Sequence, residues 1–209
     1  MEIVLASASP QKKSLLNKLG LTFSILPPKI ELKPRKGEKP EVYIRKMALN
    51  KASKAASQKK SAYVIAHHAV IDFNGDIIQK PKDEKEARKM LQAFSGKTHE
   101  IVGVVVIQKG KEIRYEGVQR SQVKFKKLES PVIDEYLKSN ESLDHKGGYF
   151  VQGEGGMLVE SIEGSYFNVV GLPLLPLIRA LKKEGIEVSE EVQQTAEMQE
   201  KSIKESFPR

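Results

Sequence analysis

Apolar residues fall into short runs separated by polar turns along most of the chain, a pattern that predicts strands alternating with amphipathic helices. The run at residues 3–6 predicts a buried strand, and the leucine spacing over residues 10–19 predicts a helix directly after it. Ser9 is a typical N-cap for that helix and Gly20 a typical residue just past its end. The chain therefore opens with a strand that turns straight into a capped helix.

The remaining runs predict mixed secondary structure. Asn74 and Gly75 form the strongest two-residue hairpin signal, so the strand after them should return antiparallel to the strand before them. Short continuous apolar runs indicate buried strands, and apolar residues three and four apart indicate helices. The further predicted strands are residues 21–26, 62–71, 76–78, 101–107, 113–115, 123–125 and 157–162. The further predicted helices are residues 40–57, 83–94, 131–137 and 173–185.

This order of elements predicts an α/β or mixed α+β fold, in which helices flank a central mixed β-sheet. No linker separates two independent domains, so we expect a single domain over residues 1–186. The stretch 187–209 is polar, and it predicts a C-terminal helix or tail.

Composition narrows the class of protein. Hydrophobic residues make up 39% of the 209 residues and charged residues 30%, as in globular proteins. No apolar run is long enough to span a membrane, and no signal-peptide pattern opens the sequence. The absence of cysteine excludes disulfides and thiolate metal sites. These features fit a protein of the reducing cytoplasm.

The formal net charge of +8 is local rather than spread over the chain. Residues 29–60 hold 11 basic and 3 acidic side chains, and the rest of the chain is neutral overall. Such a segment attracts nucleotides, nucleic acid or anionic surfaces. Aromatic residues are only 6% and tryptophan is absent, so no stacking motif accompanies the lysines and a nucleic-acid partner is disfavoured.

Three lysines lie where they could bind phosphate, although two of them also have a simpler interpretation. Lys12 follows the turn at residues 7–9, where free N–H groups of the helix start favour an anion; a solvated basic helix start fits as well. Lys51 lies on the apolar stripe of helix 40–57, where most lysines extend to solvent. Lys80 precedes helix 83–94, a suitable place for a phosphate contact.

Three runs in the chain resemble signatures of the Maf family of nucleoside triphosphate pyrophosphatases. They are Leu5-Ala-Ser-Ala-Ser-Pro10, Asp144-His-Lys-Gly-Gly-Tyr-Phe-Val-Gln-Gly153 and Ser165-Tyr-Phe-Asn-Val-Val-Gly-Leu-Pro173. The resemblance covers residues 2–185. It implies an elongated central mixed sheet with two lobes around a cleft, as in inosine triphosphate pyrophosphatases. The family run for the second signature is Asp-Lys-Ala-Gly-Ala-Tyr-Gly-Ile-Gln-Gly, so Lys146 stands at an alanine position.

The resemblance also implies a reaction and a set of site residues. Water attacks the α-phosphorus of a nucleoside triphosphate and releases a monophosphate and pyrophosphate, and the closing motifs resemble the group acting on dTTP and UTP. The implied substrate-binding residues are Ser7, Ser9, Lys12, Lys51, Lys80 and Gln152. Glu31 matches the acidic position near the metal, and the implied cofactor is a divalent cation, Mg²⁺ or Mn²⁺.

Two departures from the family pattern affect the expected chemistry. The family continues from Pro10 with two arginines, whereas this chain has Gln11 and Lys12. The family ends the strand at residues 62–66 with Ala-Asp-Thr, and the matching positions hold His67 and His68, so that His67 takes the catalytic place. Magnesium prefers oxygen ligands, whereas imidazole suits transition metals and also serves as a general base.

Three functional hypotheses follow from the sequence. The first is an active pyrophosphatase with an altered catalytic centre, whose partner is its nucleoside triphosphate substrate. The second is a nucleotide-binding Maf homologue with weak or no turnover. The third, and weakest, is a nucleic-acid-binding module built on the basic segment. The sequence leaves the nucleotide base and a homodimer open.

Overall fold

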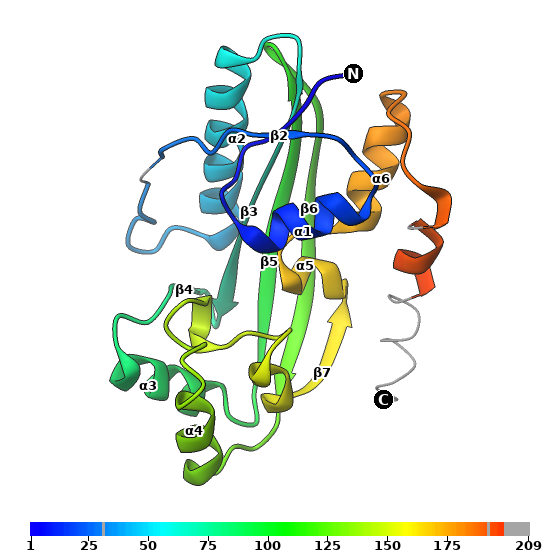
Figure 1. The fold of residues 1–209 in the computed structure, drawn as a ribbon. Coiled ribbons are helices and arrows are strands. Elements are labelled where there is room, and N and C mark those ends of the chain that lie inside the picture. Colours follow the sequence, from blue (N-terminus) through cyan, green and yellow to red (C-terminus); the bar gives the residue numbers. More distant parts are fainter. Residues whose placement is uncertain (31, 192, 199–209) are drawn as a thin grey trace.

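One mixed β-sheet runs the length of the molecule (Figure 1). The computed structural model describes residues 1–30, 32–191 and 193–198. In this part of the chain seven strands pair in the order β2-β1-β3-β5-β6-β7, and β4 pairs with β3. The strands are β1 Ile3–Leu5, β2 Ser24–Ile25, β3 Tyr63–Phe73, β4 Asp76–Ile78, β5 Thr98–Lys109, β6 Glu112–Phe125 and β7 Val159–Gly164. β1 is parallel to β2 and β3, and the other pairs are antiparallel, which confirms the predicted mixed sheet.

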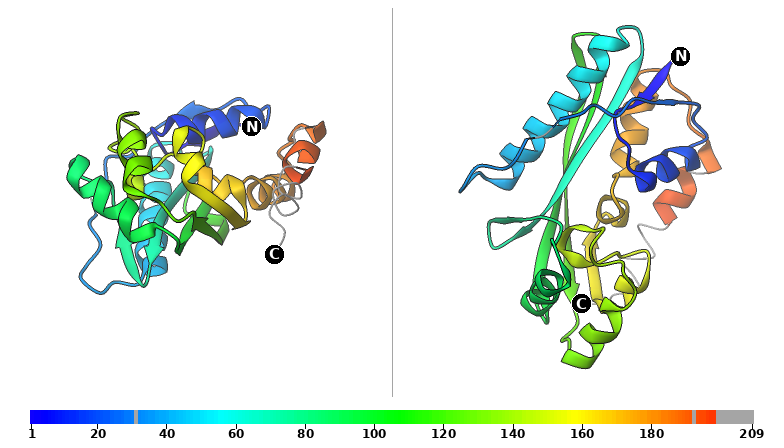
Figure 2. Two further views of the ribbon diagram at one scale, coloured as in Figure 1. Left: turned by 90° about the horizontal axis from the view of Figure 1, so that it is seen from below. Right: turned by 60° about the vertical axis from the view of Figure 1, so that its left-hand side comes forward.

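Helices cover both faces of this sheet, as predicted (Figure 2). The α-helices are α1 Pro10–Lys18, α2 Pro40–Gln58, α3 Glu84–Phe94, α4 Ser130–Leu137, α5 Tyr166–Val170 and α6 Leu174–Lys183. Two short 3₁₀ helices, η1 Lys146–Gly148 and η2 Glu154–Leu158, follow α4. α2 lies on one face of the sheet, and α1 and α6 lie on the other (Figure 2). None of the described helices is long and apolar enough to cross a membrane.

Alternation along β1 explains how one strand serves two cores. Ile3 and Leu5 point to the cluster formed with α1 and α6, whereas Val4 points to the cluster formed with α2. Successive strand side chains project to opposite faces, so a continuous apolar run is the pattern expected of a strand buried on both sides. The run at residues 3–6 therefore folds as its sequence predicts.

A third apolar cluster lies at the opposite end of the long strands, and it makes the molecule two-lobed (Figure 1). It joins α3 and α4 to the far ends of β3, β5 and β6, with Phe94 and Phe125 at its centre. The three long strands pass through both lobes and hold them in one body. The predicted two-lobed arrangement is thus built on shared strands rather than on a linker.

The predicted hairpin is confirmed, whereas one strand assignment differs from the prediction. Asn74 and Gly75 have positive φ angles of 57° and 89° and join β3 to antiparallel β4, which confirms the predicted hairpin. The sequence pattern predicts two strands at residues 113–115 and 123–125, but both belong to the single strand β6. Its polar middle pairs with β5 through backbone hydrogen bonds. Hydrophobic spacing misses such a stretch because the backbone ladder, not side-chain burial, defines it.

Two further predictions concern the second strand and the C-terminal segment. The predicted strand 21–26 contracts to Ser24–Ile25, the two residues in register with Val4 and Leu5 of the short strand β1. In the predicted C-terminal segment 187–209, Val188 and Ala196 are buried in the cluster with α6. Residues 192 and 199–209 of that segment lie outside the described residues. The division between 1–186 and 187–209 stays a prediction.

Leu16→Ala tests the packing of α1 on the sheet. Leu16 is fully buried, so we expect the free energy of unfolding to fall by about 2–5 kcal/mol through lost burial and a residual cavity. Leu143→Ala is the matched control, since Leu143 is 42% exposed and should change stability by about 0.5 kcal/mol or less. Urea unfolding with unchanged m-values measures both. Equal losses in the two variants would contradict the assigned core.

Candidate active site

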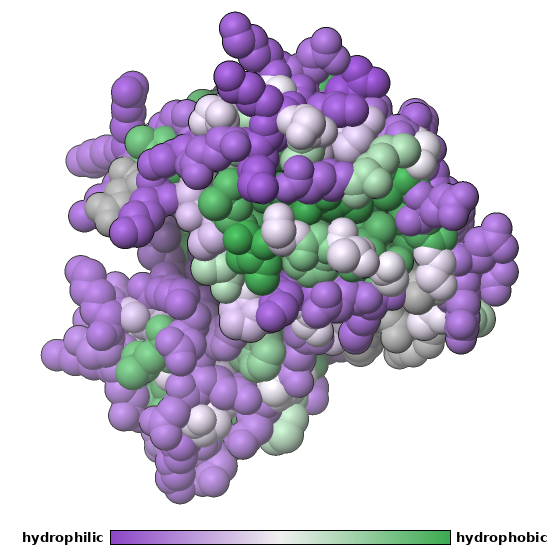
Figure 3. All heavy atoms as spheres, turned by 45° about the horizontal axis from the view of Figure 1, so that its top comes forward, coloured by the Kyte–Doolittle hydropathy of each residue, from purple (hydrophilic) through white to green (hydrophobic). Residues whose placement is uncertain are grey.

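A cleft of about 580 Å³ lies between the lobes, beside the middle of the long strands. One wall comes from the start of α1 and from α2, and the opposite wall comes from residues 144–151 around η1. Its floor is formed by β3, Ile101 of β5 and residues 168–171 at the end of α5. In the space-filling view the molecule is hollowed between its upper and lower parts, with mainly hydrophilic residues at the border (Figure 3).

The turn between β1 and α1 contributes a capped helix start to the cleft. The Ser9 hydroxyl accepts the Lys12 amide hydrogen at 3.5 Å and donates to Gln11 Oε1 at 2.9 Å. The Ser9 amide donates to Ser7 Oγ at 3.2 Å. Ser9, Gln11 and Lys12 line the cleft, and Ser7 orders the turn behind them. The local sequence dictates this arrangement, because every partner lies within three residues.

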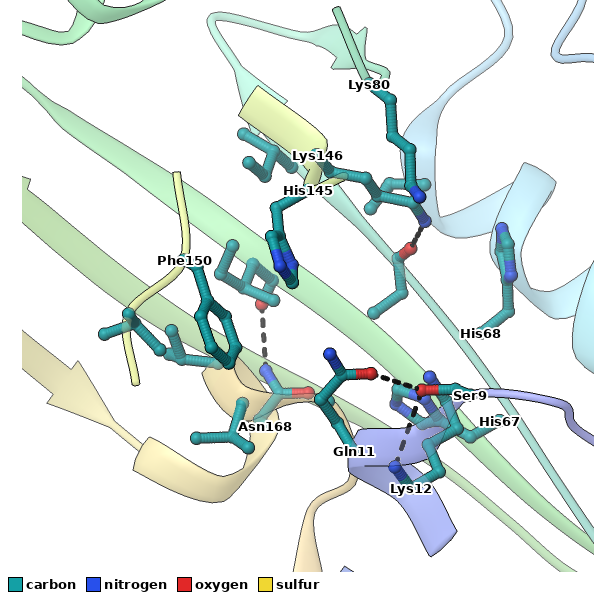
Figure 4. Close-up of a pocket in the computed structure, with 18 of the residues that line it drawn as sticks. Ser9, Gln11, Lys12, His67, His68, Lys80, His145, Lys146, Phe150 and Asn168 are labelled. Carbon is teal, nitrogen blue, oxygen red and sulfur yellow. Dashed lines mark hydrogen bonds between the residues drawn. The ribbon is translucent and has the colours of Figure 1, made fainter. Parts of the chain in front are cut away.

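Four lysines converge on the cleft from separate segments of the chain, and three of them, Lys12, Lys80 and Lys146, are labelled in Figure 4. Lys12 comes from α1, Lys51 from α2, Lys80 from the connection between β4 and α3, and Lys146 from η1. Lys146 donates a hydrogen bond to the carbonyl of Ala69 in β3. In the described part of the chain, none of the four takes part in an ion pair with a carboxylate. The cleft is therefore a concentration of uncompensated positive charge.

This crowding weakens proton binding by the lysines themselves. Burial lowers the pKa of Lys146 to about 7, and Lys12, Lys51 and Lys80 act on it in the same direction. Burial and the neighbouring Lys51 lower the pKa of Lys12 to about 8. The pKa of Lys51 also falls, through burial. An anion in the cleft would reverse these shifts, because an opposite charge favours the protonated form.

His67 and His68 lie side by side on β3 but face opposite sides of the sheet, as consecutive strand residues must. His68 faces α2, where its Nδ1 lies 3.4 Å from Lys51 Nζ and its ring meets the edge of Tyr43. His67 faces α5 and is fully buried, and neither of its ring nitrogens has a hydrogen-bond partner among the described residues.

Gly103 makes room for His67. A Cβ at Gly103 would lie 2.8 Å from His67 Nε2 and 2.4 Å from Asn168 Oδ1. Asn168 is fixed by its amide, which donates to Ile101 O at 3.0 Å and to Ser121 Oγ at 3.1 Å. Its Oδ1 has no partner in the described residues and borders the cleft. The floor of the cleft thus presents buried polar atoms that are not saturated by the protein.

Both histidines of β3 are neutral in the ligand-free cleft. Burial lowers the pKa of His68 to about 2, and the charges of Lys146, Lys51 and Lys12 act in the same direction. Burial and the same lysines hold the pKa of His67 well below its usual value. Neither ring adds positive charge to the cleft at neutral pH.

The glycine-rich signature shapes the wall opposite α1. Gly147 has a φ of 70°, a backbone conformation that favours glycine, and a Cβ there would lie 2.5 Å from Ile71 Cδ1. The turn directs Lys146 toward β3. His145 stacks on Phe150 with ring centroids 4.2 Å apart, and both rings line the cleft (Figure 4).

The residues suggested by the sequence are only partly brought together. Five of them line the cleft, namely Ser9, Lys12, Lys51, His67 and Lys80. Ser7 lies behind the wall, and Gln152 is exposed outside it with its side chain against Tyr166. Glu31 lies outside the described residues. Sequence reasoning missed Lys146, Asn168 and the pair His145–Phe150; Lys146 carried a signal as a charged residue inside a glycine-rich run.

The described residues of the cleft do not fit a divalent metal ion. They provide no group of three His, Cys, Asp or Glu side chains that could hold one. Asp144 is the one carboxylate among the described lining residues. His67 and His68 project to opposite faces of β3, so they cannot ligate the same ion. Four ammonium groups nearby would also repel a cation.

The mixed sheet and its flanking helices define an α/β protein whose cleft is lined by four lysines. Residues 2–184 match the family described as Maf-like protein, and the chain belongs to the Maf family. It is 38% identical over 189 residues to a dTTP/UTP pyrophosphatase of Bacillus cereus, covering 90% of this chain and 98% of that protein. It has the same identity and coverage with the dTTP/UTP pyrophosphatase of Bacillus anthracis. Among solved structures, it is similar to a HAM1 protein from Coxiella burnetii, with a TM-score of 0.44, 19% identity, and coverage of 60% of this chain and 73% of that chain.

The lowered pKa values of the lysines in the cleft predict how the stability of the protein depends on pH. The pKa values of Lys12 and Lys146 lie below those of the unfolded chain, so between about pH 7 and about pH 10 the unfolded state binds more protons. Stability of the ligand-free protein should therefore rise with pH across this range, by at most about 1.4 kcal/mol per pH unit for each lysine. Lys146→Met should flatten the rise.

Urea unfolding at several pH values between about 6 and 9.5 measures this slope. Lys124→Met is the matched control, because Lys124 is an exposed lysine in β6 that pairs with Glu160 at 2.7 Å. The control should keep the wild-type slope. An identical slope in Lys146→Met would show that the fold does not lower the pKa of Lys146.

Proposed function

We propose that this protein is a nucleoside triphosphate pyrophosphatase that hydrolyses pyrimidine nucleotides such as dTTP and UTP to the monophosphate and pyrophosphate. Membership of the Maf family and the 38% identity to dTTP/UTP pyrophosphatases support this activity. The observation that carries the proposal is the convergence of Lys12, Lys51, Lys80 and Lys146 on one cleft. A triphosphate is the ligand whose charge such a cluster complements.

The reaction requires positioning and charge stabilisation more than covalent chemistry. Water attacks the α-phosphorus, the bond from that phosphorus to the bridging oxygen breaks, and pyrophosphate leaves with the bonding electrons. Backbone N–H groups at the start of α1 and the lysine ammonium groups stabilise the negative charge that builds up on the departing oxygens. No step here depends on a metal ion, because the described residues do not fit one.

The geometry favours His68 over His67 as the group beside the attacking water. His68 contacts Lys51 on the side of the sheet that carries α2, whereas His67 is fully enclosed beside Asn168. A bound triphosphate raises the pKa of a nearby imidazole, which makes His68 a better proton acceptor in the complex than in the empty cleft. The role of His67 stays a prediction from the sequence.

We assign the nucleoside to the wall opposite α1. Phe150 stacks on His145 there, and Val151 and Val169 extend the same wall as apolar residues. Aromatic and aliphatic surfaces of this kind take up a base by stacking and apolar contact. The proposal includes a cytoplasmic location and leaves a homodimer open.

A binding-only protein is the second candidate, favoured by one observation. Apart from Asp144, the described residues of the cleft offer no carboxylate to activate water, and both histidines of β3 hold protons weakly. The nucleic-acid hypothesis has less support, since cations of the basic segment are partly neutralised. Examples are Lys46 with Glu38 at 2.6 Å and Lys59 with Glu2 at 2.9 Å.

Pyrophosphate release from dTTP, UTP, CTP and GTP tests the activity. Lys51→Met should lower kcat/KM for the preferred nucleotide by about 10- to 100-fold, because it removes a cation that stabilises the transition state. Lys124→Met, on the outer part of β6, should leave it unchanged. No pyrophosphate from any nucleotide, with binding retained, would establish the binding-only protein instead.

Substitution of each histidine by aspartate distinguishes their roles. In the presence of magnesium, His68→Asp should release pyrophosphate about tenfold or more faster than the wild type, since it adds an oxygen ligand on β3 and a negative charge beside Lys51. His67→Asp should instead lower thermal stability, because it buries a carboxylate with no hydrogen-bond partner. A rate increase in His67→Asp alone would restore the assignment made from the sequence.

A further inference from the structure

Lys146 occupies the centre of the cluster of charges in the cleft. Its ammonium group is hydrogen-bonded to the Ala69 carbonyl, one residue beyond His68 on β3. It interacts electrostatically with Lys12, Lys51 and Lys80, and with both histidines of β3. The positive-φ conformations of Gly147 and Gly148 fix the turn that directs it there. The Lys146 side chain thus lies at the middle of the site, held by the backbone of β3, and a bound polyanion would favour its protonated form.

The histidines beside Lys146 leave its charge uncompensated. A carboxylate at His67 or His68 would neutralise part of the cluster, whereas the two neutral rings do not. Asp144 is exposed at the rim and forms no ion pair with the four lysines in the described part of the chain. The described site therefore lacks both the oxygen ligands and the negative potential that would attract a divalent cation.

We propose that the cleft binds the polyphosphate of its nucleotide as the metal-free anion, with the Lys146 ammonium in place of a divalent cation between the protein and the phosphates. This inference rests on the proposed function, since it concerns how the same nucleotide is held. It specifies the form of the ligand: the uncomplexed triphosphate, not its magnesium complex.

Charge matching explains the preference. A free nucleoside triphosphate carries about four negative charges near neutral pH and its complex with a divalent cation about two. When a bound polyanion keeps all four of Lys12, Lys51, Lys80 and Lys146 protonated, their ammonium groups balance the first of these charges and overcompensate the second. A metal ion that remained on the phosphates would face ammonium groups in a partly buried cleft, where repulsion is weakly screened.

Calorimetric titration of the full chain with α,β-methylene-UTP, which resists cleavage of the bond to be broken, tests the inference without turnover. We expect the dissociation constant in EDTA to equal or fall below that in excess magnesium. Inorganic tripolyphosphate should behave in the same way, because the lysines contact phosphate rather than the base. Binding that requires magnesium or manganese would overturn the inference and leave the proposed function standing.

Two variants test the role of the Lys146 charge. Lys146→Met should weaken tripolyphosphate binding in EDTA by about tenfold or more, which corresponds to about 1.4 kcal/mol. The exposed Lys124→Met should not change it. His68→Asp should also weaken binding in EDTA, and magnesium should then restore it. Unchanged affinity in Lys146→Met, with its fold verified by thermal unfolding, would overturn the inference.

The outcomes separate this inference from the proposed function. Binding of the nucleotide only with a metal ion supports a nucleotide enzyme and contradicts metal-free binding. Binding of tripolyphosphate but of no nucleotide supports metal-free phosphate binding by the four lysines and contradicts the proposed substrate. An absence of binding to both probes, with and without metal, overturns both proposals.

Discussion

Repulsion among four lysine ammonium groups that share one cleft is the constraint on which the rest of the structure depends. Lys12, Lys51, Lys80 and Lys146 come from segments distributed over more than half of the sequence, and no carboxylate of the described residues pairs with them. Left to themselves, such groups would separate into solvent. The apolar clusters on both faces of the sheet, and the cluster at its far end, supply the free energy that keeps them together.

The long strands hold the segments that carry these lysines around one cleft. β3, β5 and β6 pass through both lobes, so the turn at α1 and the turn at η1 cannot move apart without disrupting a ladder of backbone hydrogen bonds. The protein thus stores unfavourable charge in the ligand-free state, as active sites commonly do at a cost to stability. A polyanion relieves that repulsion, which links ligand binding, protonation of the lysines and stability in one equilibrium.

Neutral histidines complete the balance of charge. In the cleft, His67 and His68 avoid adding to the repulsion because burial and the lysines suppress their protonation. They also remove the carboxylate expected by resemblance to the Maf family. On the two proposals made above, the same substitution would weaken metal-assisted activation of water and strengthen the attraction for a free phosphate chain. The proposals thus predict that histidine at these positions slows metal-assisted hydrolysis and tightens metal-free phosphate binding.

The sequence by itself determined the features that depend on neighbours in the chain. The Ser9 cap, the Asn74–Gly75 hairpin and the two-faced strand at residues 3–6 follow from local hydrogen bonds, backbone conformation and side-chain alternation. Tertiary structure decided features that depend on distant partners. The polar middle of β6 is a strand because β5 pairs with it, and Lys146 enters the site because it reaches Ala69, 77 residues away. Alternation along a strand requires that His67 and His68 face opposite ways, but only the packing of α2 on the sheet decided which of them meets Lys51.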